Sequence, residues 1–402
     1  MKKIVLILVM VMILGACTKV PESVEPPVII DDPAAPAIPD EVMTSGNFEE
    51  DLTSLMPSDQ NVVISPFSIK MALALAANGA AGDTQKEILE VLGVTDLGAY
   101  NEAAQKAIQD GAAGEIELNI SNSIWLNTDT QPGVTFSDEY KRVVDECFEA
   151  TAAEVKKDNA VKTINDWVEE KTKGKIKDIL SDDEFLAALV NAIYFKADWV
   201  NPFEAESTYE MEFTDANGKK TEIDFMNQSE DFNYYEDENL QMLEMAYKGD
   251  DISMYVFLPK EGKSVTQAGV DKAIAEKKME EVEVSIPKFK TEFDVKLKDI
   301  LKTLGVSEAF NPLGAEFKGM FDNLPEGDNV WIDDVIHKAF IEVDEKGTEA
   351  AAATVVVMYD TAMLIEDQPK PKVFKADRPF SYIIRDNVSG DIYFSGQFSY
   401  AE

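Results

Sequence analysis

The sequence predicts an α+β fold in a single domain, and three observations lead to that prediction. The chain has 402 residues, of which 45% are hydrophobic, so it can bury one large core. Segments with the helical period of hydrophobic residues come mostly early in the chain, and strand-like segments come mostly late. Helices and strands that are grouped in this way, rather than alternating, are typical of α+β proteins.

Four segments are expected to form helices. The first begins at Ser65, because its hydroxyl can cap a helix and Pro66 needs no amide donor at the first helical position. Alanine and leucine residues follow as far as Asn78. The other three segments carry apolar residues at helical spacing, and they are Asp83–Leu92, Tyr140–Phe148 and Val161–Lys173. Cys147 lies within the second of these three and is expected to pack as a small apolar residue.

One strand-like segment, Leu186–Phe195, is apolar on both faces of a period-two pattern. It is therefore predicted to be a central strand that is covered on both sides. Asn191 lies in its middle, and a buried amide needs hydrogen-bond partners. The other expected strands are Asn61–Ile64, Ile252–Leu258, Val282–Ile286, Val335–Val343, Phe380–Arg385 and Ile392–Phe398.

Residues 1–16 have the pattern of a signal peptide, in which Lys2 and Lys3 precede an apolar run that is too short to span a membrane. The segment Leu14-Gly15-Ala16-Cys17 resembles the lipobox of prokaryotic lipoproteins. In such a segment the cysteine becomes the lipidated first residue, so lipidation is expected at Cys17. An ordinary signal peptide with an incidental cysteine remains the alternative.

Residues 17–43 are rich in proline and acidic residues, a composition that stays extended and cannot form a core. This segment is expected to be a tether that joins the lipid anchor to one domain, residues 44–402. The protein is therefore expected to be exported and held at the cell envelope or surface, facing the extracellular space, with the lipid as its only contact with the membrane.

Composition excludes several classes of function. A net charge of −39 with a pI near 4.3 argues against binding to nucleic acid. His337 is the only histidine and there are two cysteines, so a zinc site of the usual ligands cannot be assembled. No Gly-x-Ser-x-Gly motif supplies a nucleophile. We therefore predict no catalytic residue, no metal and no cofactor, and a carboxylate-based hydrolase is the only enzyme hypothesis left.

Four blocks of the sequence carry a resemblance to a known family: Asn61–Ile69, Asn191–Trp199 with Pro202 and Phe203, Asp334–Val343, and Asp377–Phe380. With these blocks in the family's order, the sequence from about Thr44 to the C-terminus resembles the serpin family of serine protease inhibitors. The resemblance implies a monomer with a large central β-sheet, smaller sheets, about eight or nine helices and an exposed reactive-centre loop, residues 346–372.

The resemblance also assigns roles to polar residues that composition alone does not explain. In serpins, Ser65, Ser68, Asn191 and His337 would form the shutter, a polar cluster under the point where the large sheet opens. Trp199 resembles the tryptophan of the breach, at the top of the same sheet. Satisfied core polar groups and a plain core aromatic residue are the alternatives.

The segment that begins at Glu345 resembles the hinge and upper loop of an inhibitory serpin. Its hinge residues would be Glu345, Gly347, Thr348, Ala350, Ala351, Ala352, Ala353 and Thr354. In an extended chain, the even-numbered residues from Thr348 to Met358 share one face, and that face carries no charge. Such a face can be buried as an inserted strand. An alanine-rich helix is the alternative, but the valines at 355–357 favour a strand. The hinge is expected to be exposed in the intact protein.

The family's spacing, counted forward from Glu345, places the bond cut by the protease at Thr361-Ala362. Counting back from Phe380 gives a position near Gln368, so the loop is several residues longer than usual. The forward count is preferred because the sheet fixes the length of the inserted strand and because Pro369 makes the later bond a poor substrate; bonds after Met358 and Met363 stay open.

Between Lys346 and Lys370 there is no Lys or Arg. The expected partners are therefore elastase-like or subtilisin-like serine proteases outside the cytoplasm, with cysteine proteases as a further class. The protein would inhibit them as a suicide substrate, in which the cut loop inserts into the sheet. The alternative function is a non-inhibitory serpin that acts as a binding or chaperone-like surface lipoprotein.

Overall fold

A computed structural model of the chain describes residues 45–112, 116–249, 251–348 and 370–401. Within them lie eight α-helices: α1 (Phe48–Ser54), α2 (Pro66–Gly79), α3 (Gly82–Leu92), α4 (Leu97–Ala112), α5 (Asp138–Phe148), α6 (Lys157–Lys171), α7 (Gln267–Glu276) and α8 (Lys298–Leu304). Together with two large β-sheets, these helices make the fold α+β, as the sequence predicts. None of the helices in the described part of the chain is long and apolar enough to cross a bilayer.

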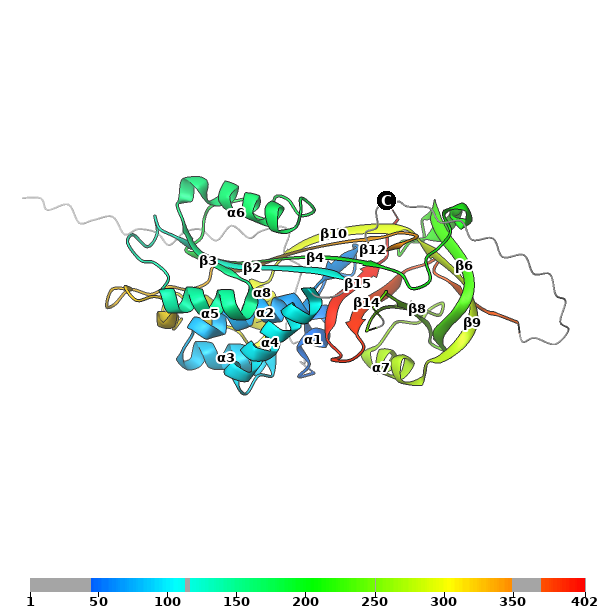
Figure 1. The fold of residues 1–402 in the computed structure, drawn as a ribbon, viewed down its shortest axis with the longest axis horizontal. Helices are drawn as coiled ribbons and strands as arrows, with labels where there is room; N and C mark the ends of the chain where they lie inside the picture. The colour runs from blue at the N-terminus through cyan, green and yellow to red at the C-terminus, as the bar shows by residue number, and fades with distance from the viewer. Residues whose placement is uncertain (1–44, 113–115, 250, 349–369, 402) are drawn as a thin grey trace, which may run out of the picture. The chain divides into compact units, whose positions relative to one another are not determined.

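The first sheet has six strands, in the order β10 (Phe289–Lys296), β11 (Asp334–Val343), β12 (Gly347–Thr348), β4 (Ala187–Asp198), β2 (Glu117–Asn127) and β3 (Thr151–Val155). Strands β11 and β4 also pair directly with each other. This sheet runs across the middle of Figure 1, where α6 covers one face and helices α2 to α5 lie on the other side.

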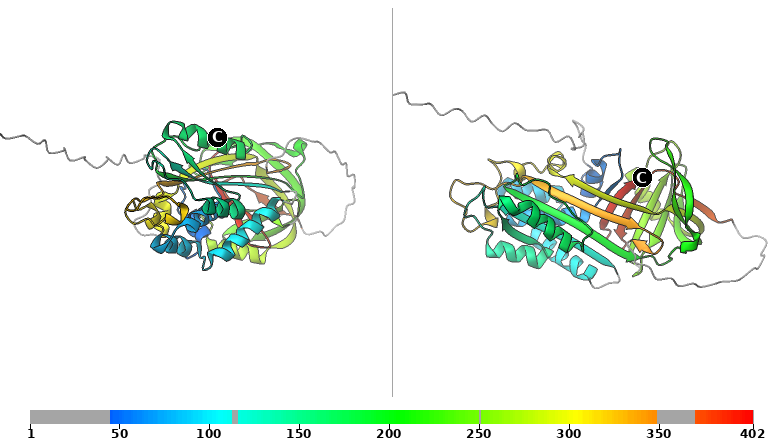
Figure 2. Two further views of the ribbon diagram at one scale, coloured as in Figure 1. Left: turned by 60° about the vertical axis from the view of Figure 1, so that its left-hand side comes forward. Right: turned by 90° about the horizontal axis from the view of Figure 1, so that it is seen from above.

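The second sheet has nine strands. The path along it is β1 (Val62–Ile64), β15 (Ile392–Phe398), β14 (Phe380–Asp386), β8 (Ile252–Pro259), β7 (Leu240–Ala246), β6 (Lys220–Glu236), β9 (Lys278–Pro287) and β13 (Lys372–Lys375), and β5 (Tyr209–Thr214) pairs with β6 off this path. The right-hand view of Figure 2, from above, shows the two sheets next to each other.

Both faces of β4 are buried, as predicted from its double apolar pattern. Leu189 and Ile193 pack into the main core with α2, whereas Val190 packs into a second cluster with Ile164 of α6. Helix α2 begins where the sequence predicts, because the Ser65 hydroxyl accepts a hydrogen bond from the Ser68 amide at 3.1 Å. The six-stranded sheet is therefore held between two apolar layers.

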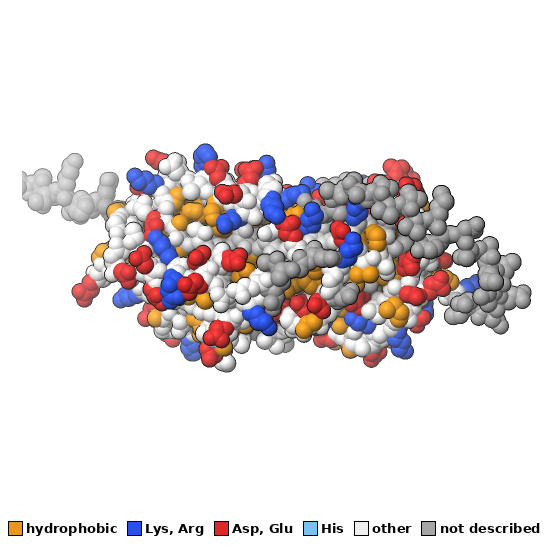
Figure 3. Space-filling model, in the orientation of Figure 1, with side chains coloured by type: hydrophobic (Ala, Val, Ile, Leu, Met, Phe, Trp, Pro, Cys, Tyr) orange, Lys and Arg blue, Asp and Glu red, His pale blue; other side chains and the backbone are white. Residues whose placement is uncertain are grey.

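Several elements do not follow from the sequence patterns above. Helix α6 begins at Lys157 rather than Val161. The elements that are not predicted are helices α1, α4, α7 and α8 and strands β2, β3, β5, β6, β7, β10 and β13. The half-buried Cys147 packs against the main core, as expected. On the face drawn in Figure 3, the coloured Lys and Arg side chains are interspersed with Asp and Glu side chains rather than gathered into a stripe.

Candidate functional site

Strands β4 and β11 form the central pair of the six-stranded sheet. They run parallel and are paired from Asp334 opposite Ala188 to Phe340 opposite Tyr194. Beyond that point the short strand β12 lies between them and is antiparallel to both. The central pair is therefore closed along most of its length and separated at one end by two residues of the hinge.

A buried polar cluster lies under the closed part of this pair. His337 of β11 is directly opposite Asn191 of β4, and its Nδ1 is hydrogen-bonded to the Asn191 side-chain oxygen. The amide of Ser65 donates a hydrogen bond to His337 Nε2 at 3.1 Å. Because Nε2 accepts, a neutral ring with its proton on Nδ1 satisfies both contacts.

Asn191 extends the cluster to two further elements. Its Nδ2 donates to the carbonyl oxygen of Ser68 at 3.1 Å, to the Ser68 hydroxyl and to the side-chain oxygen of Asn122 on β2. The four residues predicted for the shutter therefore lie together, and all are fully buried. We call Ser65, Ser68, Asn122, Asn191 and His337 the shutter cluster.

Asn122 is a member that the sequence analysis misses. It is directly opposite Asn191 in the antiparallel pairing of β2 and β4. The available signal was the polar run Ser121-Asn122-Ser123, which lies between the apolar residues Ile120 and Ile124 of the same strand. Its side-chain nitrogen has no hydrogen-bond partner among the described residues, which leaves one unsatisfied donor in the cluster.

Burial controls the charge of the histidine. Desolvation lowers the pKa of His337 from its ordinary value of 6.5 to about 3. Both of its hydrogen-bond partners, a backbone amide and a side-chain amide, are groups that do not titrate. The ring is therefore neutral at ordinary pH, in agreement with its hydrogen bonds.

At the open end of the central pair, the hinge lies inside the sheet. Thr348 is opposite Val343 of β11 and Ala197 of β4, and its side chain is fully buried. Its hydroxyl is hydrogen-bonded to the hydroxyl of Tyr247 at 2.7 Å. The expectation that the intact hinge is exposed is therefore wrong at Thr348, because the edges of β4 and β11 offer ladder partners to the first hinge residues.

Trp199, predicted for the breach, packs beside this inserted hinge. Its ring stacks on Tyr247 with the ring centres 4.3 Å apart, and its Nε1 donates to the Asp344 carbonyl oxygen at 3.0 Å. Its backbone amide donates to the carbonyl oxygen of Lys346 at 2.7 Å. Trp199 therefore holds the turn that carries the chain from β11 back into the sheet.

Gly347 and Glu345 complete the hinge. A Cβ atom at Gly347 would lie 2.0 Å from the Ala197 carbonyl oxygen, so only glycine fits there. The Glu345 carboxylate accepts a hydrogen bond from Thr208 at 2.9 Å and pairs with Lys288 at 3.0 Å. Burial acts to raise the pKa of Glu345, but hydrogen bonds from its own amide, Lys288 and Thr208 lower it overall.

The described residues do not include every predicted site. Residues Ala350, Ala351, Ala352, Ala353 and Thr354 of the hinge, the bond between Thr361 and Ala362, and the lipidation site Cys17 all lie outside them.

A family model described as serpin (serine protease inhibitor) matches residues 45–401. The chain belongs to the serpin family. It is 37% identical over 359 residues to a serpin-like protein of Thermococcus kodakarensis, covering 85% of this chain and 81% of that one. It is 32% identical over 359 residues to antitrypsin of Bombyx mori, covering 84% of this chain and 88% of that one.

The fold agrees with solved serpin structures. The native state of tengpin, a thermophilic serpin, matches with a TM-score of 0.79 and 29% identity, covering 90% of this chain and 96% of that chain. Serpins are generally protease inhibitors rather than enzymes. The described residues therefore have the serpin fold, with strands β4 and β11 paired directly along most of their length.

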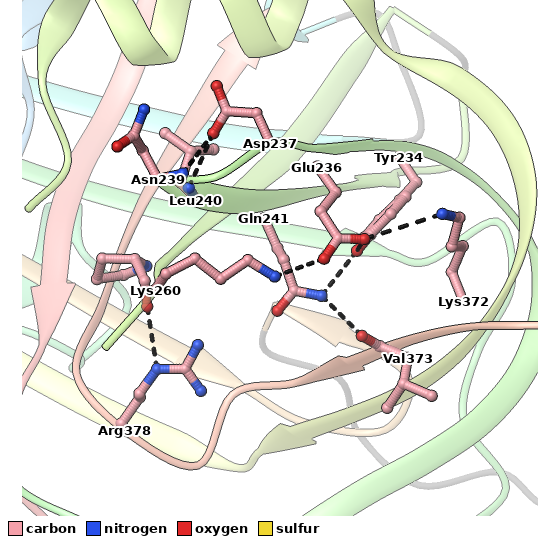
Figure 4. A network of polar contacts seen from close by, with 11 residues as sticks. Tyr234, Glu236, Asp237, Asn239, Leu240, Gln241, Lys260, Lys372, Val373 and Arg378 are labelled. Atoms are coloured by element: carbon pink, nitrogen blue, oxygen red, sulfur yellow. Dashed lines mark hydrogen bonds and ion pairs between the residues drawn. The ribbon is translucent and has the colours of Figure 1, made fainter. Parts of the chain in front are cut away.

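The far end of the serpin loop returns to the nine-stranded sheet at β13, an edge strand that pairs in parallel with β9. Figure 4 shows the side chains that hold it. Gln241 Nε2 donates to the Val373 carbonyl oxygen at 2.8 Å and to the Tyr234 hydroxyl at 2.7 Å. Nearby, Arg378 Nε donates to the Pro259 carbonyl oxygen at 3.0 Å. The loop is therefore anchored at both ends by buried or half-buried contacts.

Proposed function

We propose that this serpin inhibits serine endopeptidases as a suicide substrate, by inserting its cut loop between β4 and β11. One observation carries the proposal. Strand β12 already occupies the upper end of that position, with ladder pairing to both neighbours. Insertion is then the continuation of a strand that has already begun.

The register of β12 says where each further residue would lie. Because β12 is antiparallel to both neighbours, each step forward along the loop is one step back along β4 and β11. Thr354 is six residues beyond Thr348, so it would lie opposite Asn191, six before Ala197, and His337, six before Val343. Insertion would therefore place a hydroxyl group between the two central residues of the shutter cluster.

The same register assigns the two faces of the inserted strand. Thr348 faces the main core, as do Ala197 and Val343 opposite it. The small residues Ala350 and Ala352, with Thr354 and Val356, would share that face and fill space under the sheet. Glu349 would fall on the other face, beside Lys196 and Glu342. The uncharged face predicted from the sequence is thus the one that must be buried.

The chemical step belongs to the protease. Its serine oxygen would attack the carbonyl carbon of Thr361, the bond to the nitrogen of Ala362 would break, and Ala362 would leave as a free amine carrying the proton. The loop up to Thr361 is then bonded to the enzyme as an ester. If insertion is faster than hydrolysis of that ester, the enzyme is carried along with the strand and trapped.

Specificity is proposed from the loop sequence. The segment between Lys346 and Lys370 has no Lys or Arg, which disfavours trypsin-like enzymes and favours elastase-like or subtilisin-like ones, with cysteine proteases as a further class. We test this by incubating the full chain with elastase, subtilisin and trypsin. A detergent-resistant complex with one of the first two, and release of a fragment that begins at Ala362, are expected. Cleavage without any complex would overturn the inhibitory function.

We also propose that the protein is a lipoprotein, exported and anchored to the cell envelope through Cys17. The support is the lipobox-like segment that ends at Cys17 and the proline-rich composition of residues 17–43. The lipid would hold the inhibitor where extracellular proteases arrive.

A second candidate function is the binding of a small molecule without inhibition. It has one observation behind it, a cavity of about 480 Å³ between α1, α7 and the strands β14 and β15. Met56, Phe257, Val270 and Ile383 give it apolar walls, and Glu50 also lines it. Binding of the apolar dye N-phenyl-1-naphthylamine, lost on Val270→Arg, would support it, and absence of binding would remove it.

A further inference from the structure

Tyr247 links the two sheets at the point where the hinge enters. It follows β7 of the nine-stranded sheet and forms an isolated bridge to Trp199, just beyond β4 of the six-stranded sheet. Its backbone amide donates to the Ile252 carbonyl oxygen at 3.0 Å, and its side chain is fully buried. The sequence patterns give no sign of this role.

The ring of Tyr247 is held on two sides by aromatic neighbours. Trp199 stacks on it at 4.3 Å with 16° between the ring planes, and Phe195 meets it edge-on at 5.1 Å. These two neighbours fix the orientation of the ring. The Tyr247 hydroxyl is therefore directed at the Thr348 hydroxyl, 2.7 Å away. If Thr348 left the sheet, a buried phenol would lose this partner, which is unfavourable.

We propose that Tyr247 is a positioning residue that keeps the hinge inserted before any protease cuts the loop. The effect on protease trapping rests on the inhibitory function proposed above. The role of Tyr247 in keeping Thr348 in the sheet does not depend on that function. Bringing the hinge into the sheet closes a loop, which costs entropy before any later contact is made. With that step already taken in the intact protein, the cut loop continues by adding adjacent residues.

The consequence concerns the choice that follows cleavage. Either the ester with the protease is hydrolysed, which releases the enzyme and leaves a cut, inactive inhibitor, or the loop inserts first and the protease is trapped. A hinge that is already in the sheet shortens the path to trapping. Tyr247 would therefore lower the number of inhibitor molecules consumed for each protease molecule trapped, without touching the protease or the bond that is cut.

The test compares variants that remove a single hydroxyl. Tyr247→Phe keeps the aromatic stack and Thr348→Val keeps the volume, so each removes only the hydrogen bond. A buried hydrogen bond corresponds to about a five-fold change in an equilibrium. We therefore expect the amides of residues 344–348 to exchange with deuterium about five-fold faster in each variant. The double variant should add nothing, because both changes remove one interaction, and Thr348→Ser should behave as wild type.

A matched control separates positioning from general stability. Tyr140 is also a buried tyrosine, and its hydroxyl donates to the Leu75 carbonyl oxygen at 3.0 Å, away from the hinge. Tyr140→Phe should lower the melting temperature but leave hinge exchange and the inhibitor-to-protease ratio unchanged. Tyr247→Phe should speed hinge exchange about five-fold and should raise the inhibitor-to-protease ratio above that of wild type.

The outcomes distinguish the two proposals. Unchanged hinge exchange in Tyr247→Phe, or equal effects of Tyr247→Phe and Tyr140→Phe, would overturn the role of Tyr247. Faster hinge exchange in a protein that traps no protease would support the role of Tyr247 and overturn the inhibitory function. Faster exchange with an unchanged inhibitor-to-protease ratio would show that Tyr247 holds the hinge but that insertion is not limited there, which overturns the kinetic consequence.

Discussion

Because His337 is buried, the free energy of unfolding should depend on pH in the acid range. The variant His337→Gln removes this contribution and so allows it to be measured. His337 has a pKa of about 3 in the folded chain and 6.5 when exposed. Below pH 6.5 the unfolded chain binds a proton that the folded chain does not, so stability falls as the pH falls towards 3. The slope is about 1.4 kcal/mol per pH unit, which makes the loss about 3 kcal/mol at pH 4.5. Glutamine can keep both hydrogen bonds and does not titrate.

Other groups also respond in this range, so the difference between the two proteins is the quantity to measure. Burial raises the pKa of Asp334 to about 6, and that group contributes stability below pH 4 which is lost as the pH rises through 6, opposite in sign to His337. Subtraction cancels it. Urea unfolding followed by tryptophan fluorescence from pH 7.5 to 4 would give the difference. If the free energy of unfolding fell by the same amount in wild type and His337→Gln as the pH was lowered, the assignment of a neutral, buried ring would be refuted.

Three further predictions concern the reactive loop, its hinge and the lipid anchor. Nicking the loop between Val357 and Lys370 should raise the melting temperature by on the order of 10 °C or more, since the sheet gains a central strand, and calorimetry of intact and nicked protein measures it; no rise would mean that the loop does not insert. Thr348→Arg should destabilise the intact protein by about 2 kcal/mol or more, because the position is buried, and should yield cut inhibitor with little complex. Denaturation of the uncut variant at the wild-type midpoint would contradict this. Cys17→Ser should release the protein from membranes, and an unchanged membrane fraction on centrifugation would remove the lipoprotein proposal.

Patterns that depend on one element were predictable from the sequence. The start of α2 follows from Ser65 and Pro66, and the burial of β4 on both faces follows from its apolar run. Asn191 and His337 stand out because they are polar residues in apolar strands. The sequence alone does not pair them, however. That pairing required the resemblance to a family, and the structure then placed the two residues opposite each other.

Patterns that depend on the pairing of distant segments were not predictable. Asn122 joins the shutter cluster only because β2 and β4 pair in one particular register. Tyr247 meets Thr348 because the two sheets meet at Trp199, and nothing local to Tyr247 reports that. Strand β6 has no continuous period-two pattern, because the five consecutive polar residues from Asn227 to Asp231 interrupt it. Helix α4 has few large apolar residues, so its period is weak.

The direction of the central strands bears on where the sheet can open. All seven direct pairs between β4 and β11 are parallel, whereas the pairs of β2 with β4 and of β10 with β11 are antiparallel. Parallel ladders are slightly less stable per residue than antiparallel ones. A strand inserted in the direction of β12 would replace that one parallel ladder with two antiparallel ladders. The β4–β11 pairing, which must separate for insertion, is thus the weakest pairing in the middle of the sheet. Replacing it with two antiparallel ladders favours the form with the inserted strand.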